Sequence, residues 1–519
     1  MSPFFIISCI VGYFGFLLLI AWYTSRNANN KSYFLANKSA PWYAVAFGMI
    51  SDSLSGVTFI SVPGAVGTSQ FSYMQVILGY FVGYFIIANV LLPIYYHRNL
   101  ISIYTYLFHR FGKFSQKTGS FFFLLSRLFG AAARLYLTAS VIQLFVFDAI
   151  GVPFWLSVSI IIFLILLYTY KGGIKTLVWT DTFQSVFLLM GVVLSITAIS
   201  HELGYGIKDF FSSVSKSEFT KTFFWDWHEK SFFPKQFLGG MFIAIAMTGL
   251  DQNMMQKNLS CRSLSDAQKN IRWFSVVMIL VNIFFLSLGV LLYTYANLKG
   301  VAVPLNASGK LDTDSLFPIL ALQHLGAFAG IVFIIGLTAA TFSSADSVLT
   351  TLTTSFMIDI YSPSTQTISS QRKNECLDLK QKKILRPQPA NFCLDENTEA
   401  TNEIRITRIR HFTHISFAVI LLGIILLFRI LNQQAIINTV LEVAGYTYGP
   451  LLGLFAFGIF SKRIPNDRLV PVVCIIAPLI CYFLSAYSSQ LFGNYKFGLE
   501  LLLVNGMFTY AGLLFISKK

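Results

Sequence analysis

Long apolar segments alternate with short polar segments along almost the whole chain. A helix that crosses a membrane needs about 20 predominantly apolar residues. Segments of about this length or longer occupy Phe4–Tyr23, Pro41–Gly67, Ser72–Tyr96, Gly119–Ile150, Val152–Tyr170, Val178–Ser200, Pro234–Met255, Phe274–Ala296, Gly326–Ile360, Phe412–Leu431, Ile436–Phe460, Leu469–Tyr487 and Phe497–Ile516. The pattern predicts an all-α polytopic membrane protein with about 13 transmembrane helices.

The composition supports the same class of protein. The 519 residues are 55% hydrophobic and only 12% charged, whereas soluble domains are about one quarter charged. An ordinary soluble enzyme is therefore disfavoured. The 52 Phe residues and the long apolar segments rule out a disordered chain.

The basic residues follow the alternation of the predicted spans. Of the 38 Lys and Arg residues, 27 fall in loops on one predicted side, 9 fall on the other side, and Arg127 and Arg134 fall within a span. Basic loops face the inside of the cell. The bias predicts an N-terminus outside and a C-terminus inside, and it explains the net charge of +15 without a nucleic-acid partner.

Two longer polar stretches separate the predicted spans. His201–Phe233 is expected to form an outside loop with aromatic residues. Ser362–Thr407 is rich in Lys, Gln, Asn, Glu and Pro and has no apolar period. It is therefore expected to be a flexible inside loop, either a solvated linker or a regulatory segment.

The second predicted span has a polar centre. Ser51–Thr58 contains hydroxyl groups, a glycine and the carboxylate of Asp52. A helix that unwinds in the middle of the membrane frees backbone carbonyls that can coordinate a cation. Small residues for close helix packing are the alternative, but they do not account for Asp52. The sequence therefore favours a broken helix here.

The ninth predicted span carries a cluster of oxygen ligands. Residues i, i+3 and i+4 share one face of a helix, so the Ala340 carbonyl, Ser343 and Ser344 can converge. Ser343, Asp346 and Ser347 form a second set one turn further on. Oxygen ligands suit hard cations, and a set with at most one carboxylate suits a monovalent ion. The alternative is that the hydroxyls bond to their own helix.

Five separated motifs in this chain resemble the sodium/solute symporter family, which includes sodium–proline, sodium–sugar, sodium–iodide and sialic acid transporters. The motifs are Ser55-x7-Pro63, Gly172-Gly173-x4-Val178-Trp-Thr180-Asp181-x2-Gln184, Asp251-Gln252-x3-Gln256-Lys257, Phe317-Pro318 leading to Phe342-Ser343-Ser344-Ala-Asp346-Ser347, and Gly445-Tyr446-x-Tyr448-Gly449-Pro450-Leu-Leu-Gly453. They lie in order on predicted helices across about residues 41–460.

The resemblance implies a LeuT-type core of two inverted five-helix repeats. Residues 1–40 would then hold an extra N-terminal helix and an inside loop. Residues 41–200 would form the first repeat, 201–233 the outside loop, and 234–460 the second repeat with the loop 362–407. Two C-terminal helices would occupy 461–519.

The resemblance also implies two sodium sites. The main site would use the carbonyls of Ser51, Leu54 and Ala340 and the hydroxyls of Ser343 and Ser344. A possible second site would use Asp181, Asp346 and Ser347. Many relatives have a neutral residue where this chain has Asp346, so the number of coupled ions stays open.

The substrate would bind beside the unwound helix. The candidate residues there are Ser53, Ser55, Thr58, Tyr73 and Gln75. Arg134 is the candidate partner of an anionic substrate, because Arg binds carboxylates with two hydrogen bonds. The alternative for Arg134 is a structural ion pair with one of the intramembrane acids. Coupling or structural roles are expected for the intramembrane polar residues Asp52, Asp251, Gln252 and Glu442, since such groups are costly unless paired.

The expected function is sodium-coupled symport of a small polar organic solute by alternating access. The solute would be a sugar, an amino acid, a sialic acid or another carboxylate, and the protein would lie as a multi-pass protein in the cell membrane. An enzyme is not expected, because no HExxH motif or carboxylate cluster marks a membrane face, and His411 and His414 are expected to be interfacial. The alternatives are a transporter-like sensor and coupling to protons instead of sodium.

Overall fold

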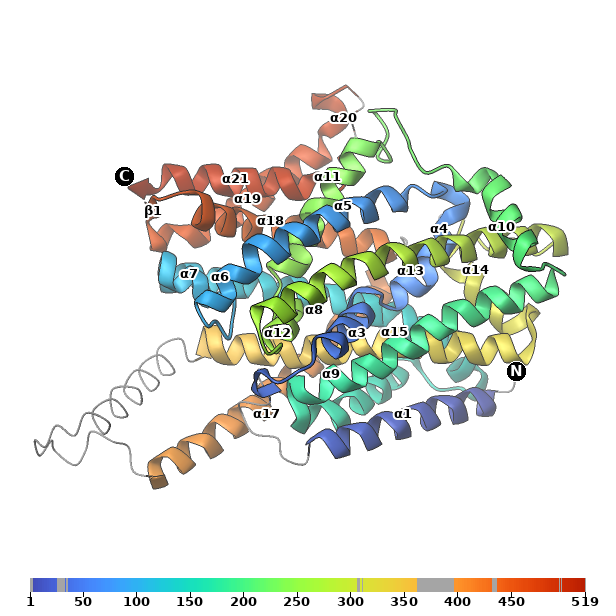
Figure 1. The fold of residues 1–519 in the computed structure, drawn as a ribbon, viewed down its shortest axis with the longest axis horizontal. Helices are drawn as coiled ribbons and strands as arrows, with labels where there is room; N and C mark the ends of the chain where they lie inside the picture. Colours follow the sequence, from blue (N-terminus) through green and yellow to red (C-terminus); the bar gives the residue numbers. More distant parts are fainter. Residues whose placement is uncertain are drawn as a thin grey trace, which may run out of the picture.

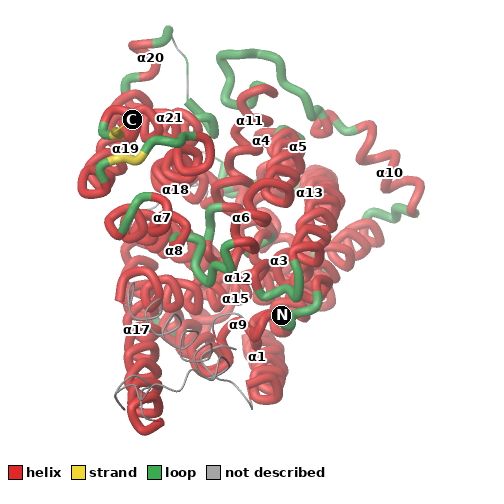
Figure 2. The backbone as a smooth tube through the Cα atoms, turned by 60° about the vertical axis from the view of Figure 1, so that its left-hand side comes forward, coloured by secondary structure: helices red, strands yellow, loops and turns green. Residues whose placement is uncertain are grey.

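The computed structural model describes residues 3–25, 33, 36–305, 309, 311–361, 396–431, 436–493, 495 and 497–518. Nearly all of these residues are helical (Figure 2). The helices are α1 (Pro3–Ser25), α3 (Trp42–Ser53), α4 (Gly56–Ser69), α5 (Tyr73–Ile86), α6 (Leu92–His97), α7 (Thr105–Arg110), α8 (Lys113–Ile142), α9 (Phe154–Glu202), α10 (Ile207–Lys216), α11 (Phe233–Ala244), α12 (Gln252–Leu259), α13 (Leu264–Lys299), α14 (Thr313–Ile319), α15 (Gly326–Ser355), α17 (Glu396–Leu431), α18 (Ile436–Phe460), α19 (Val470–Ala486), α20 (Ser488–Leu491) and α21 (Leu501–Phe515). The two short strands β1 (Ile464–Pro465) and β2 (Ser517–Lys518) pair antiparallel.

The expectation of an all-helical membrane protein is confirmed. Within the described residues, nine helices are long and apolar enough to cross a membrane, and the bent pair α3–α4 raises the number to ten. Phe154–Thr169 and Leu501–Phe515 are apolar but shorter. The helices run mainly along one axis, and the two chain ends lie at opposite ends of that axis (Figure 1).

Two of the expected spans are interrupted, and two others are joined in one helix. α3 and α4 meet at an angle of 57°, which confirms the broken helix. The spans Val152–Tyr170 and Val178–Ser200 join in the single kinked helix α9, whose bend lies at Gly173 with φ 54°. A β-carbon at Gly173 would collide with the ring and backbone of Tyr33, so only glycine fits this bend. The span Pro234–Met255 divides into α11, a π-helical turn (Ile245–Gly249) and α12.

α15 forms the centre of the bundle. It is buried along most of its length and packs against α9, α8, α17, α4 and α3. Ala, Ser and Thr residues on α15 allow this close approach, as is usual between helices in membranes. Because α15 contacts both halves of the broken helix, it holds its hydroxyl cluster against the break.

The stretch expected to be a flexible inside loop differs in part from the structure. α17 begins at Glu396, so the last residues of Ser362–Thr407 continue a membrane-directed helix. Residues 362–395 lie outside the described residues. The helical start gives α17 a length of 36 residues, of which the apolar span occupies Ile404–Ile430.

Asp359 connects three elements near one end of the bundle. Although its position near a span end predicts an exposed interfacial charge, its carboxylate is buried. It accepts hydrogen bonds from Ser102 Oγ (2.7 Å), Gln116 Nε2 (2.9 Å) and Ser355 Oγ (2.9 Å). These donors belong to the loop between α6 and α7, to α8 and to α15, so the carboxylate fixes these elements together.

Candidate solute and sodium site

The break between α3 and α4 exposes backbone oxygens at the centre of the bundle. α3 ends at Ser53 and α4 begins at Gly56. Among the described residues, no backbone N–H bonds to the carbonyl of Ser51 or Leu54, as expected for the last carbonyls of a helix. Both residues are buried. These two oxygens are therefore available to a cation.

The hydroxyl cluster of α15 meets the broken helix directly. Ser343 Oγ donates a hydrogen bond of 2.6 Å to Ser51 Oγ. Ser344 Oγ donates to the Ala340 carbonyl over 3.3 Å, so this hydroxyl bonds to its own helix, as the alternative prediction had it. Ser51 Oγ in turn bonds to the backbone carbonyl of Asp181 over 3.2 Å. The structure thus brings Ser51 and Ser343 into contact and places Ser344 and Ala340 one turn apart on the same helix.

Gly56 allows α4 to begin against α8 and α15. A β-carbon at this position would lie closer than 3.0 Å to the hydroxyls of both Thr138 and Thr341, which are themselves hydrogen-bonded at 2.5 Å. We expect Gly56→Ala to destabilise the protein by about 1–3 kcal/mol through overpacking and to lower transport. Thermal unfolding in detergent measures the change, with Gly130→Ala as control because Gly130 has open space around it. Equal stability of the two variants would contradict the close packing.

Lys257 is the main correction to the sequence-based picture. Its position beyond the predicted end of a span indicates an inside loop, but its side chain is fully buried. Its Nζ lies 2.7 Å from Asp52 Oδ2 and 2.5 Å from Asp181 Oδ2, and 3.3 Å from the carbonyl of Gly48. One ammonium group therefore pairs with two acids of the site.

A second buried ion pair lies beside the pocket. Arg127 Nε is 2.5 Å from Asp251 Oδ2, and its Nη2 donates to the Met247 carbonyl over 3.2 Å. The phenol of Tyr448 also donates to Asp251 Oδ2. Asp251 additionally caps α12 by accepting from the backbone N–H of Met254. Asp251 is thus a structural acid whose charge Arg127 balances.

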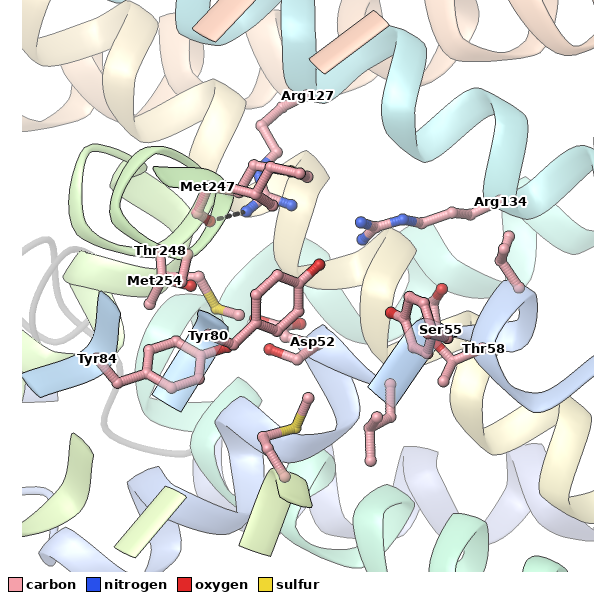
Figure 3. A pocket seen from close by; sticks show the side chains of 17 residues that line it. Asp52, Ser55, Thr58, Tyr80, Tyr84, Arg127, Arg134, Met247, Thr248 and Met254 are labelled. Atoms are coloured by element: carbon pink, nitrogen blue, oxygen red, sulfur yellow. Dashed lines mark hydrogen bonds between the residues drawn. The ribbon is translucent and has the colours of Figure 1, made fainter. Parts of the chain in front are cut away.

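A pocket opens beside the broken helix (Figure 3). Of the predicted substrate residues, Ser53, Ser55, Thr58, Tyr73 and Arg134 line it. The other polar residues of the lining are Asp52, Tyr80, Tyr84, Arg127 and Thr248.

Arg134 points into the pocket from α8 (Figure 3). In the described part of the chain its guanidinium makes no ion pair. Two acids that were its expected partners are paired with other cations, Asp52 with Lys257 and Asp251 with Arg127. The structural role expected as an alternative is therefore not seen.

Three predicted polar residues lie elsewhere. Gln75 is a correction: its amide bonds to the carbonyl of Ser231 (2.8 Å) and to the N–H of Phe224 (3.3 Å), so it holds the loop between α10 and α11. Gln252 holds the loop before α7 through Ile101 and Ile103. Glu442 is a further correction, because its side chain is exposed and no intramembrane cation pairs with it among the described residues.

The predicted second sodium site is only partly assembled as expected. Ser347 Oγ lies 3.3 Å from Asp181 Oδ2, and Ser347 N–H donates to Asp346 Oδ1 over 2.5 Å. Within the described residues, Asp181 Oδ1 and Asp346 Oδ2 have no hydrogen-bond partner. Lys257 pairs with two of the three buried acids here, Asp52 and Asp181, and among the described residues no ion pair reaches Asp346.

His414 is also a correction to the sequence-based picture. It is buried, not interfacial, and its two ring nitrogens lie 3.0 Å from the hydroxyls of Thr169 and Thr353. It joins α17 to α9 and α15. The sequence did not predict this role of His414, because a His in a basic segment is usually solvated.

A helix broken at mid-length, a polar pocket beside the break and hydroxyls facing it define a helical membrane transporter. Residues 33–385 match the model of the sodium:solute symporter family. The chain belongs to this family. It is a multi-pass membrane protein that couples the transport of a small solute to sodium.

Individual proteins agree with this assignment. The chain is 25% identical to the sodium/sialic acid symporter NanT of Aliivibrio fischeri over 91% of this chain and 86% of that protein. It is 25% identical to the sodium/glucose cotransporter of Vibrio parahaemolyticus over 64% and 63% of the two chains. The solved outward-open, substrate-bound structure of a Na⁺-coupled sialic acid symporter has a similar fold, with a TM-score of 0.77, 21% identity and coverage of 99% and 98%.

Proposed function

We propose that this symporter imports an organic acid whose carboxylate binds Arg134. The observation that carries the proposal is the guanidinium of Arg134, which lies in the pocket and has no ion pair with any residue that the structure describes, while the neighbouring acids have other partners. Arg134 is half-buried, and a cation that is partly removed from water without a counter-ion carries a desolvation cost. A carboxylate from the solute removes this cost and gains two charge-assisted hydrogen bonds. Sialic acid carries such a carboxylate and glucose does not.

Sodium would occupy the break in the helix. The main site consists of the carbonyls of Ser51, Leu54 and Ala340 with the hydroxyls of Ser343 and Ser344. The unpaired carbonyls and the contact between Ser51 and Ser343 support it. The site joins the broken helix to α15, so sodium favours the conformation in which they are close. A second sodium at Asp181, Asp346 and Ser347 would balance two carboxylate oxygens to which no described residue donates a hydrogen bond.

The topology belongs to the same proposal. The nine long helices, the bent pair α3–α4, the apolar helices Phe154–Thr169 and Leu501–Phe515, and the interrupted segment of α11 and α12 together give thirteen crossings. An odd number agrees with chain ends at opposite ends of the bundle (Figure 1). The basic loops place the N-terminus outside and the C-terminus inside. The core then forms two inverted five-helix repeats.

Arg134→Ala tests the substrate class. We expect wild-type protein in proteoliposomes with a sodium gradient to accumulate a labelled carboxylate from a panel of N-acetylneuraminate, lactate and alanine, and not glucose. Each charge-assisted hydrogen bond contributes about 1.5–3 kcal/mol, so loss of both bonds in Arg134→Ala should weaken the apparent affinity by at least about 100-fold. Arg134→Lys should recover part of it, because it restores charge without the planar fork. Uptake of glucose alone, or equal uptake by Arg134→Ala, would contradict the proposal.

A further inference from the structure

The carboxylate of Asp52 faces two different environments. Its Oδ2 accepts hydrogen bonds from Lys257 Nζ at 2.7 Å and from Asn253 Nδ2 at 3.0 Å. Its Oδ1 is buried and has no hydrogen-bond partner among the described residues. Asp52 also lines the pocket that contains Arg134 (Figure 3). One oxygen of the carboxylate is therefore used by the protein, and the other has no partner among the described residues, in a side chain that lines the pocket.

An unpaired buried carboxylate oxygen is a costly feature. Leaving a buried acceptor unsatisfied costs about 1–3 kcal/mol, and more when it is charged. Two strong donors hold Asp52 Oδ2, so rotation of the carboxylate would only exchange one unpaired oxygen for the other. Since no described residue bonds to the remaining acceptor, a bound molecule is the expected source of its donor.

We propose that Asp52 Oδ1 accepts a hydrogen bond from a hydroxyl or ammonium group of the transported acid. This inference rests on the proposed function, because it requires that the carboxylate of the same solute binds Arg134. The solute is then an organic acid with a second, donor-bearing polar group. A simple carboxylate without that group leaves Asp52 Oδ1 unpaired and binds more weakly.

Asp52 also connects the solute to the sodium ligands. Lys257 links Asp52 to Asp181, and the backbone carbonyl of Asp181 accepts from Ser51 Oγ. Ser51 Oγ in turn contacts Ser343. A donor bound at Asp52 Oδ1 therefore stabilises the geometry at one end of a hydrogen-bonded chain whose other end binds sodium. This arrangement makes Asp52 a specificity-determining residue that is also placed to couple solute and sodium binding.

The first experiment needs no variant. Sodium-dependent thermal stabilisation of the purified wild-type protein is measured with acids that differ by one donor group: lactate and alanine against propionate, and N-acetylneuraminate against its 2,3-dehydro-2-deoxy analogue. For each pair that binds, we expect the donor-bearing acid to bind at least about 10-fold more tightly, since a site built around a donor rejects analogues that lack it. Equal affinities within every pair that binds overturn the inference and indicate that water fills the position.

The second experiment uses Asp52→Asn. Lys257 and Asn253 both donate toward Oδ2, so the amide oxygen stays on their side and the amide NH2 turns to the pocket. The pocket then presents a donor in place of an acceptor. We expect the preference for donor-bearing acids to fall at least about 10-fold, while the acid without the donor binds as before. A merely structural role for Asp52 would weaken both members of a pair equally.

Matched controls separate the outcomes. Glu442→Gln makes the same chemical change at an exposed acid that does not line the pocket, so the preference of this variant should equal that of the wild-type protein. If carboxylates bind and depend on Arg134 but show no preference for a donor, the inference is wrong and the proposed function stands. If no carboxylate binds with sodium, both are wrong.

Discussion

Replacing Lys257 by Met is expected to destabilise the protein strongly and to abolish sodium-driven uptake. The ammonium group is buried and pairs with both Asp52 and Asp181. Methionine fills a similar volume but leaves two carboxylates buried without their cation. Breaking a buried ion pair by removing one partner costs about 3–5 kcal/mol, so the free energy of unfolding should fall by about this amount. Thermal unfolding in detergent, together with uptake in proteoliposomes, measures the two effects.

Two further variants test whether the loss of the buried positive charge causes these effects. Lys257→Arg keeps the charge and should recover most of the stability, although the larger planar head group fits less well. Lys208→Met removes an exposed lysine from α10 and should leave stability within about 0.5 kcal/mol of the wild type. An unchanged unfolding temperature for Lys257→Met would show that Asp52 and Asp181 do not depend on this cation.

The double variant Ser343→Ala with Ser344→Ala is expected to raise the sodium requirement by at least about 100-fold. It removes both hydroxyl ligands of the proposed main site and leaves only the carbonyls of Ser51, Leu54 and Ala340. Even loss of groups that only support metal ligands costs about 10- to 100-fold in affinity. Stability should change little, because alanine suits a tightly packed helix and one lost hydrogen bond to Ser51 costs about 1 kcal/mol.

The measurement is the sodium concentration that gives half-maximal uptake, followed at a fixed solute concentration. Thr354→Val serves as control, because Thr354 is a buried hydroxyl on the same helix that contacts Gln256 and no proposed sodium ligand. Wild-type sodium dependence in the double variant would exclude these serines as ligands. If the double variant does not fold, the sodium requirement is measured for the two single variants instead. Each single variant removes one ligand, so each should still raise the sodium requirement.

Much of the fold and part of the site follow from the sequence. Hydroxyls, a glycine and an acid within one apolar segment predicted the break between α3 and α4, because such residues have no use on a helix that faces lipid. Helical spacing placed Ser343 and Ser344 near Ala340, and the contact of Ser343 with Ser51 agrees with this.

Other features depend on tertiary packing that periodicity does not report. Lys257 follows a predicted span end, but the break near Leu250 lets α12 continue into the core with all eight of its residues buried. Gln75 is two residues from Tyr73, which lines the pocket, but its amide bonds to Phe224 and Ser231 in a loop more than a hundred residues later in the chain. Which cation pairs with each intramembrane acid depends on how neighbouring helices face one another. The spacing of residues within one helix does not contain this information.

The hydrogen bonds of the Asp359 carboxylate bear on how salt affects the packing at this end of the bundle. Its partners among the described residues are two hydroxyls and an amide, all neutral, and the group is buried. Dissolved ions screen exposed charges over a Debye length of about 8 Å at physiological ionic strength, but they screen buried contacts much less. Separation of the α6–α7 loop and α8 from α15 therefore requires the loss of hydrogen bonds that salt does not weaken. The contact that Asp359 makes between these elements is therefore expected to be insensitive to ionic strength.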